Sequence, residues 1–188
     1  MKRKIIIGAS AIFMAFMAGL FIYFFMKHDT SRWEVALGGI LVSGFPLLLL
    51  LLKKIPFSTS VIIGYYLFLF CTTFLGSICK FYVSILWWDT ALHLYKGLFM
   101  GIIAITLFKI FVPKHLQNEV SKWLLFLFVL SLSIVASAIW EIYEFFGDVF
   151  YTETMQRGGN QDTMFDLSAG LLGGLIIAVY SLLRRQKI

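Results

Sequence analysis

The sequence predicts an all-α polytopic membrane protein, a bundle of six transmembrane helices. The 188-residue chain is 60% hydrophobic and only 14% charged, whereas soluble domains carry about 25% charged residues. Apolar runs recur along the whole chain, and each is close to or above the ~20 residues needed to cross ~30 Å of hydrocarbon. The chain has only three prolines to interrupt these runs. We therefore expect a single transmembrane domain over residues 1–188.

Each apolar run marks one predicted span. The six spans cover Ile5–Met26, Trp33–Leu52, Ser60–Ile78, Trp88–Val112, Lys122–Gly147 and Thr163–Leu183. The first follows "MKRK", as the apolar core of a signal peptide would, but its apolar run is too long for such a core. The following "FFMKHDT" offers no small-residue cleavage site. The first run is therefore predicted to remain a permanent span.

The distribution of Lys and Arg predicts the orientation in the membrane. Eleven of these residues lie in the two termini and in the loops after the second and fourth spans, whereas four lie in the other three loops. Positive residues stay on the cytoplasmic side, so both termini are expected in the cytoplasm of a multi-pass cell-membrane protein. The loops near residues 30, 84 and 155 are then outside. The net charge of +6 indicates contact with anionic membrane lipids and no nucleic-acid partner.

Polar residues gather where three spans reach the predicted outer face, between about residues 88 and 170. Seven of the ten acidic residues lie at this predicted outer face. On the fourth span, Asp89, His93 and Lys96 occupy positions i, i+4 and i+7, which form one stripe of a helix. Similar stripes are formed on the fifth span by Glu141, Glu144 and Asp148, and on the sixth by Asp162 and Asp166. Because a charged side chain costs about 2.5–3.5 kcal/mol at the bilayer centre, we expect the stripes to face one another.

The predicted site has many carboxylates and few cations. Lys96 and Arg157 cannot neutralise seven acids, so a divalent cation, shared protons or a cationic substrate is expected to supply the rest. Oxygen ligands favour Mg²⁺, Mn²⁺ or Ca²⁺, and Zn²⁺ also fits His with carboxylates. We expect no other cofactor. The predicted metal ligands are Asp89, His93, Glu141, Asp162 and Asp166.

This pattern of polar residues resembles a known family. Asp-x-x-x-His opens one span, Glu-x-x-Glu closes the next, and "GGNQDTMFDLSAGLLGG" enters the last. The second half of the chain, about Trp88–Gly174, is in these respects similar to the bacterial YjdF-like membrane-spanning proteins. More distantly it resembles the VanZ-like proteins linked to teicoplanin resistance, from which Ser168-Ala169 departs. The resemblance implies a bacterial inner-membrane protein whose signature polar positions are Asp89, His93, Glu141, Glu144, Asp162 and Asp166. It implies no particular reaction.

The residues leave three functions open. The first is a metal-dependent hydrolase or transferase that acts on an outer-leaflet lipid or a lipid-linked cell-envelope intermediate. In that enzyme, Glu141, Glu144 and His93 are the predicted catalytic residues. The predicted substrate-binding residues are Lys96, Arg157 and Asn160. No HExxH or GxSxG motif is present, so the enzyme hypothesis rests on the chemistry of the site.

The second function is a cation- or proton-coupled transporter, and the third is a non-catalytic accessory protein that binds an envelope component or contributes to resistance. A transporter needs a polar path that continues to the inner face. The deeper halves of spans four to six offer few polar residues, among them Thr106, Ser131, Ser133 and Ser137. We therefore favour an enzyme or a binding protein over a transporter.

Overall fold

The structure is a computed structural model that describes residues 1–117, 119–150, 155–156 and 159–183. The described residues form helices and connecting turns, and no strand occurs among them. Six of their helices are long and apolar enough to cross a membrane. The predicted fold class, an all-α chain with six candidate transmembrane helices, is confirmed.

The helices follow the predicted spans closely. Every predicted end lies within three residues of the observed one. In chain order the elements are α1 (Lys2–Met26), α2 (Thr30–Gly44), η1 (Phe45–Leu51), α3 (Thr59–Leu69), η2 (Phe70–Ile78), α4 (Phe81–Ser84), α5 (Trp88–Phe111), α6 (Lys122–Phe150) and α7 (Asn160–Leu183). The second span therefore consists of α2 and η1, and the third of α3 and η2.

The chain divides into two compact units, Met1–Trp88 and Asp89–Ile188. Every residue that the sequence nominates for the site lies in the second unit, because the division falls immediately before Asp89. The expectation of one domain over the whole chain stays a prediction.

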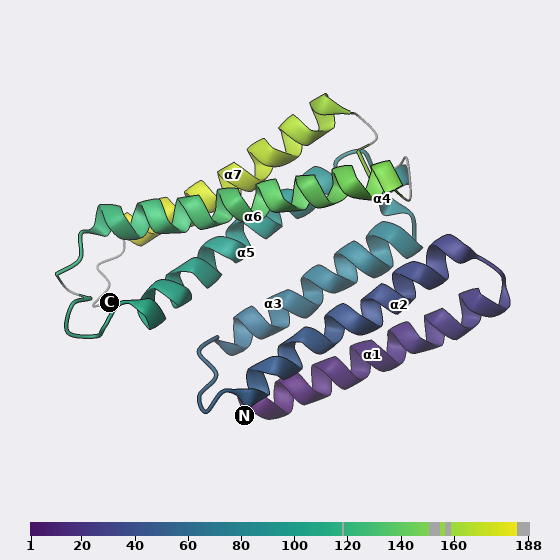
Figure 1. The fold of residues 1–188 in the computed structure, drawn as a ribbon, viewed down its shortest axis with the longest axis horizontal. Helices are drawn as coiled ribbons and strands as arrows, with labels where there is room; N and C mark the ends of the chain where they lie inside the picture. Colours follow the sequence, from purple (N-terminus) through teal and green to yellow (C-terminus); the bar gives the residue numbers. More distant parts are fainter. Residues whose placement is uncertain (118, 151–154, 157–158, 184–188) are drawn as a thin grey trace. The chain divides into compact units, whose positions relative to one another are not determined.

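In the first unit, α1, α2 and α3 lie side by side (Figure 1). Their apolar core includes Ile6, Phe13, Met17, Ala36, Ile62, Tyr66 and Leu69. Polar groups within this core bind one another: the hydroxyls of Ser10 and Tyr66 are 2.6 Å apart, and Tyr66 also donates to the carbonyl of Ser43 at 3.4 Å. These contacts link the three helices and satisfy polar groups that lipid cannot.

Two spans of this unit change helix type partway. The second span tightens into the 3-10 helix η1 around Pro46, the second residue of η1, since proline has no N–H to donate to an α-helical carbonyl. The third span widens into the π-helix η2. There the hydroxyls of Thr72 and Thr73 donate to carbonyls of the preceding turn, including that of Leu69. Such bonds compete with the regular backbone pattern.

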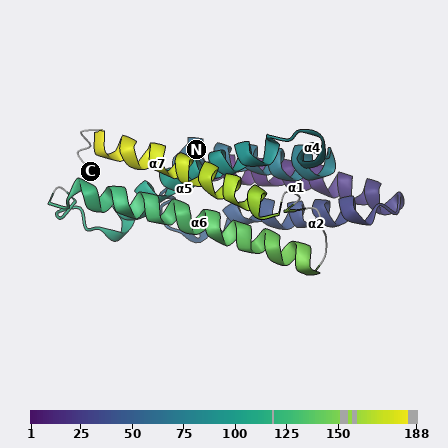
Figure 2. The same ribbon diagram turned by 90° about the horizontal axis from the view of Figure 1, so that it is seen from above.

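The second unit consists of α5, α6 and α7, and α6 and α7 run alongside each other in both ribbon views (Figures 1 and 2). Glycines allow α5 to approach α7 closely. A Cβ on Gly97 would overlap the carbonyl oxygen of Gly170, and one on Gly173 would lie 2.8 Å from the amide nitrogen of Leu98. Small residues at such positions let membrane helices pack backbone against backbone. Ser133 of α6 adds a hydrogen bond to the carbonyl of Gly97 at 3.4 Å.

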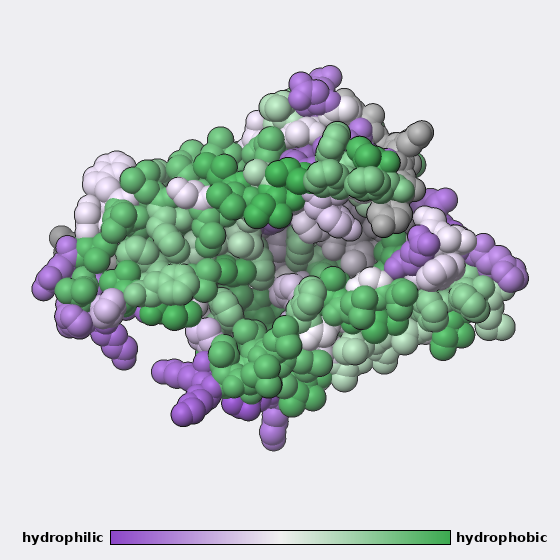
Figure 3. Space-filling model, in the orientation of Figure 1, coloured by the Kyte–Doolittle hydropathy of each residue, from purple (hydrophilic) through white to green (hydrophobic). Residues whose placement is uncertain are grey.

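The interior of the second unit changes along the helices. At the end where α5 stops and α6 begins, it is an apolar core of Ala104, Phe108, Leu125, Val129 and Ala178. Glycines and serines follow in the middle. At the other end, which we call the polar end, α5 and α7 begin, α6 finishes, and the buried side chains are ionisable. On the outside of the helices, apolar side chains cover most of the visible surface, and hydrophilic side chains gather at the helix ends (Figure 3).

Candidate metal centre

Helical spacing brings six ionisable residues together at the polar end, and all but Asp89 are buried. Asp89 lies in the first turn of α5, with His93 and Lys96 one and two turns further along the same stripe. The buried face of α6 repeats every three or four residues, which brings Glu141 and Glu144 inward. On α7, Asp166 is the first buried residue. The exposed fractions are 1% for His93, 6% for Lys96, 4% for Glu141, 8% for Glu144 and 1% for Asp166.

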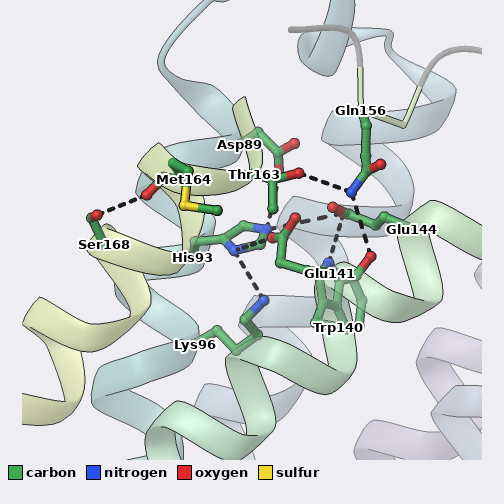
Figure 4. A network of polar contacts seen from close by, with 10 residues as sticks. All are labelled: Asp89, His93, Lys96, Trp140, Glu141, Glu144, Gln156, Thr163, Met164 and Ser168. Atoms are coloured by element: carbon green, nitrogen blue, oxygen red, sulfur yellow. Dashed lines mark hydrogen bonds and ion pairs between the residues drawn. The ribbon is translucent and has the colours of Figure 1, made fainter. Parts of the chain in front are cut away.

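His93 is the centre of this group (Figure 4). Its Nδ1 lies 3.2 Å from Oε1 of Glu141 and 3.1 Å from Nζ of Lys96. Its Nε2 lies 3.6 Å from Oδ1 of Asp89 and 4.0 Å from Oε1 of Glu144. The two ring nitrogens therefore have different surroundings: a cation and a carboxylate meet Nδ1, whereas carboxylates alone lie nearest to Nε2.

Trp140 supports the group from one side and is not among the site residues predicted from the sequence. Its indole N–H donates to Oε1 of Glu144 at 2.7 Å. Its ring lies under the ammonium of Lys96, 4.8 Å from Nζ to the ring centroid, a distance at which a cation is attracted to the face of the ring. The i, i+4 spacing of Trp140 and Glu144 was the available signal, because such residues are neighbours on a helix.

Several buried polar atoms of the group have no hydrogen-bond partner among the described residues. They are Nε2 of His93, both carboxylate oxygens of Glu141 and Oδ1 of Asp166. The 3.2 Å approach of Glu141 to Nδ1 is thus a close ion-pair contact without hydrogen-bond geometry. A buried polar group without a partner costs free energy. A cation bound between His93 and Asp166 would supply a partner for Nε2 of His93 and for Oδ1 of Asp166.

The spacing of the ligand atoms fits a metal ion. One group consists of Asp89, His93 and Asp166, and another of His93, Glu141 and Glu144. Within each group the three ligand atoms lie within 4.8 Å of one another. Two ligands of one ion are separated by at most twice the metal–ligand distance, which is about 4.0–4.8 Å for bonds of ~2.0–2.4 Å. Both groups meet this limit, and His93 belongs to both.

Electrostatics distinguish the two groups. A dication bound at Nδ1 would lie close to the ammonium of Lys96, whose Nζ is 3.1 Å from that nitrogen. At 4 Å a dication and an ammonium repel by about 8 kcal/mol in an effective dielectric of 20, twice the value for unit charges. Nε2 points away from Lys96 towards Asp89. A cation is therefore better placed at Nε2 than at Nδ1. Oδ1 of Asp89 lies closer to Nε2, at 3.6 Å, than Oε1 of Glu144, at 4.0 Å. The group of Asp89, His93 and Asp166 is thus the better cation site, and Asp166 is held there by a side-chain hydrogen bond with Thr90.

The other nominated residues lie at the margin of the group. Asp162 is half-buried in the first turn of α7 and falls outside both ligand groups formed by the described residues. Asn160 is exposed at the start of α7, and Arg157 lies outside the described residues. The assignment of Lys96, Arg157 and Asn160 to substrate binding stays a prediction, as do the catalytic roles of His93, Glu141 and Glu144.

Hydrogen bonds of Asp148 and Gln156, neither of which was predicted as a metal ligand, join α6 to α7. Asp148 accepts hydrogen bonds from the backbone amides of Met155 and Gln156, at 2.9 and 2.7 Å. The side-chain amide of Gln156 donates to the hydroxyl of Thr163 at 2.9 Å and to the carbonyl of Glu141 at 3.5 Å. These bonds join the end of α6 to the start of α7 and so fix the helices that carry Glu141 and Asp166.

Fold and site together define a multi-pass helical membrane protein with a buried carboxylate–histidine group that can hold a metal ion. The chain belongs to the family described as "Predicted membrane protein (DUF2238)", whose match covers residues 9–187. This is the YjdF-like family that the second half of the sequence resembles. The match extends over the first three spans as well, and the distant resemblance to VanZ-like proteins is not supported by it.

A relative in Thermotoga maritima, described as an uncharacterized protein, is 32% identical to this chain over 122 residues. The aligned region covers 64% of this chain and 60% of the relative. No solved structure matches the chain.

Proposed function

We propose that this membrane protein binds a divalent cation at Asp89, His93 and Asp166 and uses it on an outer-leaflet lipid or a lipid-linked cell-envelope substrate. The observation that carries the proposal is the burial of His93, Asp166 and Glu141 with unpaired polar atoms inside a helix bundle. Lipid offers no compensation for such groups. A dication supplies positive charge to the carboxylates, and Mg²⁺, Mn²⁺, Ca²⁺ and Zn²⁺ all accept oxygen ligands.

The position of the group supports action at one membrane surface. The ionisable residues lie at the polar end. The distribution of Lys and Arg along the chain, whose net charge is +6, favours an orientation in which this end meets the outer face of the membrane. The interior at the opposite end is filled by apolar side chains such as Phe108, Leu125 and Val129. A polar path through the unit would have to displace them. This packing supports a site that opens to one side and favours an enzyme or a binding protein over a transporter.

A bound cation would polarise a phosphoryl or acyl oxygen of the substrate and acidify a water. The chain itself supplies a carboxylate beside the centre, Glu144, whose Oε1 is 4.0 Å from Nε2 of His93 and is oriented by Trp140. Such a carboxylate is suited to act as a general base. The proposed reaction class is therefore metal-dependent hydrolysis or group transfer on lipid-linked material.

Metal content of the full-length protein tests the proposal. We expect about one divalent ion per chain after purification or after loading with Mn²⁺, and a higher unfolding temperature when the ion is bound. Asp166→Asn should lose the ion, because it removes a charged ligand while keeping the side-chain shape. The lipid and cell-envelope composition of cells with wild-type protein should differ from that of cells with Asp166→Asn.

Asp162→Asn is the matched control. It removes the same charge one turn earlier on α7, from a residue outside both ligand groups. It should keep the metal and the effect on envelope composition. Equal metal content in wild type and Asp166→Asn would refute the proposed centre. Metal binding without any change in lipid or envelope composition would favour a non-catalytic binding protein.

A further inference from the structure

The surroundings of His93 carry a more specific inference, which rests on the proposed function. Its Nδ1 has two neighbours of opposite kind at nearly equal distances. The ammonium of Lys96, 3.1 Å away, can only donate a hydrogen bond, and the carboxylate of Glu141, 3.2 Å away, can only accept one when ionised. Nδ1 therefore has a donor in hydrogen-bond geometry, Lys96, and a possible acceptor, Glu141, at nearly the same distance but without that geometry.

These two options correspond to the two neutral tautomers of the ring. When the proton is on Nε2, Nδ1 has a lone pair and accepts from Lys96, as the hydrogen-bond geometry at 3.1 Å allows. When the proton is on Nδ1, the lone pair is on Nε2, and the nearest acceptor for the Nδ1 proton is Oε1 of Glu141 at 3.2 Å, which a rotation of its carboxylate would bring into hydrogen-bond geometry. A metal ion needs this second tautomer, because it binds the unprotonated nitrogen.

The Nε2 side of the ring is free to take a cation. Nε2 is buried with His93 at 1% exposure, has no hydrogen-bond partner among the described residues, and lies 3.6 Å from Asp89 Oδ1. Asp89, His93 and Asp166 present ligand atoms within 4.8 Å of one another. A cation on this side avoids the ammonium of Lys96.

We propose that His93 binds the cation through Nε2 and that Glu141 is a positioning residue, which accepts the Nδ1 proton and fixes the metal-binding tautomer. Binding moves one proton from Nε2 to Nδ1 of the same ring, so the imidazole stays neutral. Lys96 gives up its hydrogen bond to Nδ1, and its ammonium remains over the ring of Trp140. Metal-binding histidines commonly donate their second N–H to a carboxylate in this way.

The sequence alone predicts Glu141 as a direct metal ligand. As a positioning residue, Glu141 instead acts on the metal through His93. The distinction has a physical consequence. A lost ligand removes a bond to the metal, whereas a lost carboxylate acceptor weakens the orientation and basicity of a ligand that remains. Loss of such an outer partner typically lowers metal affinity ~10–100-fold.

The test uses the full-length protein in lipid nanodiscs with isotopically labelled histidine nitrogens and Cd²⁺ as the probe. The chain has three histidines, so His93→Gln identifies the signals of His93. In wild type, we expect solid-state NMR to show Cd²⁺ bonded to Nε2 and a proton on Nδ1. Without Cd²⁺ we expect the proton on Nε2. Cd²⁺ bonded to Nδ1 would overturn the inference even if Glu141 variants fail to fold.

Titration of Glu141→Gln with Cd²⁺ is the second measurement. We expect one ion per chain, as in wild type, with affinity reduced ~10–100-fold and a changed Nδ1–H signal, whereas Asp166→Asn should lose stoichiometric binding. Loss of stoichiometric binding in Glu141→Gln would make Glu141 a ligand and refute the positioning role. An unchanged affinity would refute it as well. If wild type binds no Cd²⁺, the proposed function itself is refuted. If wild type binds Cd²⁺ but not through Nε2, only the present inference is refuted.

Discussion

Lys96 places an ammonium group among side chains that also favour a divalent ion. Its Nζ contacts the imidazole of His93 and the ring of Trp140, and the side chain is 6% exposed. In the metal-free protein this ammonium offsets part of the charge of Glu141 and Glu144. In the metal-bound protein the same charge repels the ion. Lys96 therefore stabilises one state of the site at the expense of the other.

Lys96→Met is expected to destabilise the metal-free protein and to strengthen metal binding. Removing the ammonium should destabilise the metal-free protein by about 3–5 kcal/mol, since it leaves buried carboxylates unpaired. It should also raise the affinity for Mn²⁺, because the repulsion is gone. The measurement is the unfolding temperature with and without Mn²⁺, which should differ more in the variant than in wild type.

Lys109→Met is the control, because Lys109 is an exposed lysine in the last turn of the same helix, α5. It should change neither quantity. If Lys96→Met is as stable as wild type but loses an effect on envelope lipids, Lys96 contacts an anionic substrate, which is the role that the sequence predicted for it.

Residue-level prediction from the sequence succeeded where helical spacing decided the outcome. Helical spacing puts Asp89 and His93 on one face of α5, and Glu141 and Glu144 on one face of α6. Because exposing these side chains to lipid costs free energy, the two faces were predicted to contact each other. Spacing could not show that Asp162 lies outside the ligand groups, since one turn of α7 separates it from Asp166. It also could not show which nitrogen of His93 faces Lys96.

At the scale of an element, the start of α2 shows how a polar residue fastens a helix end. Asp29 caps the helix by accepting from the backbone amide of Arg32 at 3.2 Å, and it also binds the Arg32 guanidinium at 2.9 Å. Arg32 donates in turn to the carbonyl of Ile78 at the end of η2. The cap thus joins the beginning of one span to the end of another within the first unit.

The pH dependence of this cap can be predicted. Slight burial raises the pKa of Asp29, but the hydrogen bonds and charge of Arg32, with the charge of Lys80, outweigh it and hold the pKa below its ordinary value of 3.8. A carboxyl with a lowered pKa in the folded state stabilises the fold above its unfolded pKa, and this stabilisation is lost as the pH falls through the folded pKa.

Asp29→Asn should therefore be less stable than wild type at pH 7, by about 0.2–1 kcal/mol for a solvent-screened pair. The difference should shrink below about pH 4, the unfolded pKa of Asp. Thermal unfolding at both pH values measures it, with Glu34→Gln as an exposed-carboxylate control on the same helix. A difference that is the same at both pH values would mean that the charge of Asp29 does not stabilise the cap.

The contact of α5 with α7 gives a second prediction at this scale. Gly97→Ala should destabilise the protein by about 1–3 kcal/mol, because its Cβ would overlap the backbone of Gly170 and force the helices apart. Gly8→Ala in α1 is the matched control, since its Cβ meets nothing within 4 Å. It should stabilise a helix interior by about 0.5–1 kcal/mol. Unfolding temperatures of the two variants should shift in opposite directions, and parallel shifts would contradict the close contact.

Helix ends were predictable to within three residues because span length is set by bilayer thickness and because polar loops flank each apolar run. Helix type within a span was not. Pro46 offered a signal for the change from α2 to η1, since proline removes one helical hydrogen bond. The π-helix η2 could not be predicted from the apolar pattern, because a run of apolar and hydroxyl residues can cross lipid as an α-helix or as a π-helix.

At the scale of the whole molecule, function depends on which membrane face the polar end meets. The family match covers nearly the entire chain, so the first unit is as much a part of the protein family as the site-bearing unit. From the sequence alone, eleven Lys and Arg residues in the termini and in the loops after the second and fourth spans, against four in the other three loops, predict that the polar end faces outward. An outward polar end gives a cation access from outside the cell and a substrate access from the outer leaflet.

Cysteine labelling in intact cells tests this orientation. Cys71 and Cys79 are first replaced by serine, and single cysteines are then introduced at Asn160, at Lys54 and at Lys187. We expect a membrane-impermeant maleimide to label the cysteine at position 160, which is exposed at the start of α7, and to reach positions 54 and 187 only after the membrane is permeabilised. These two positions belong to the side that the positive-inside rule assigns to the cytoplasm. Protection at 160 together with labelling at 187 would invert the protein. The polar end would then face the cytoplasm, and an outer-leaflet substrate would be excluded even if the metal centre itself were confirmed.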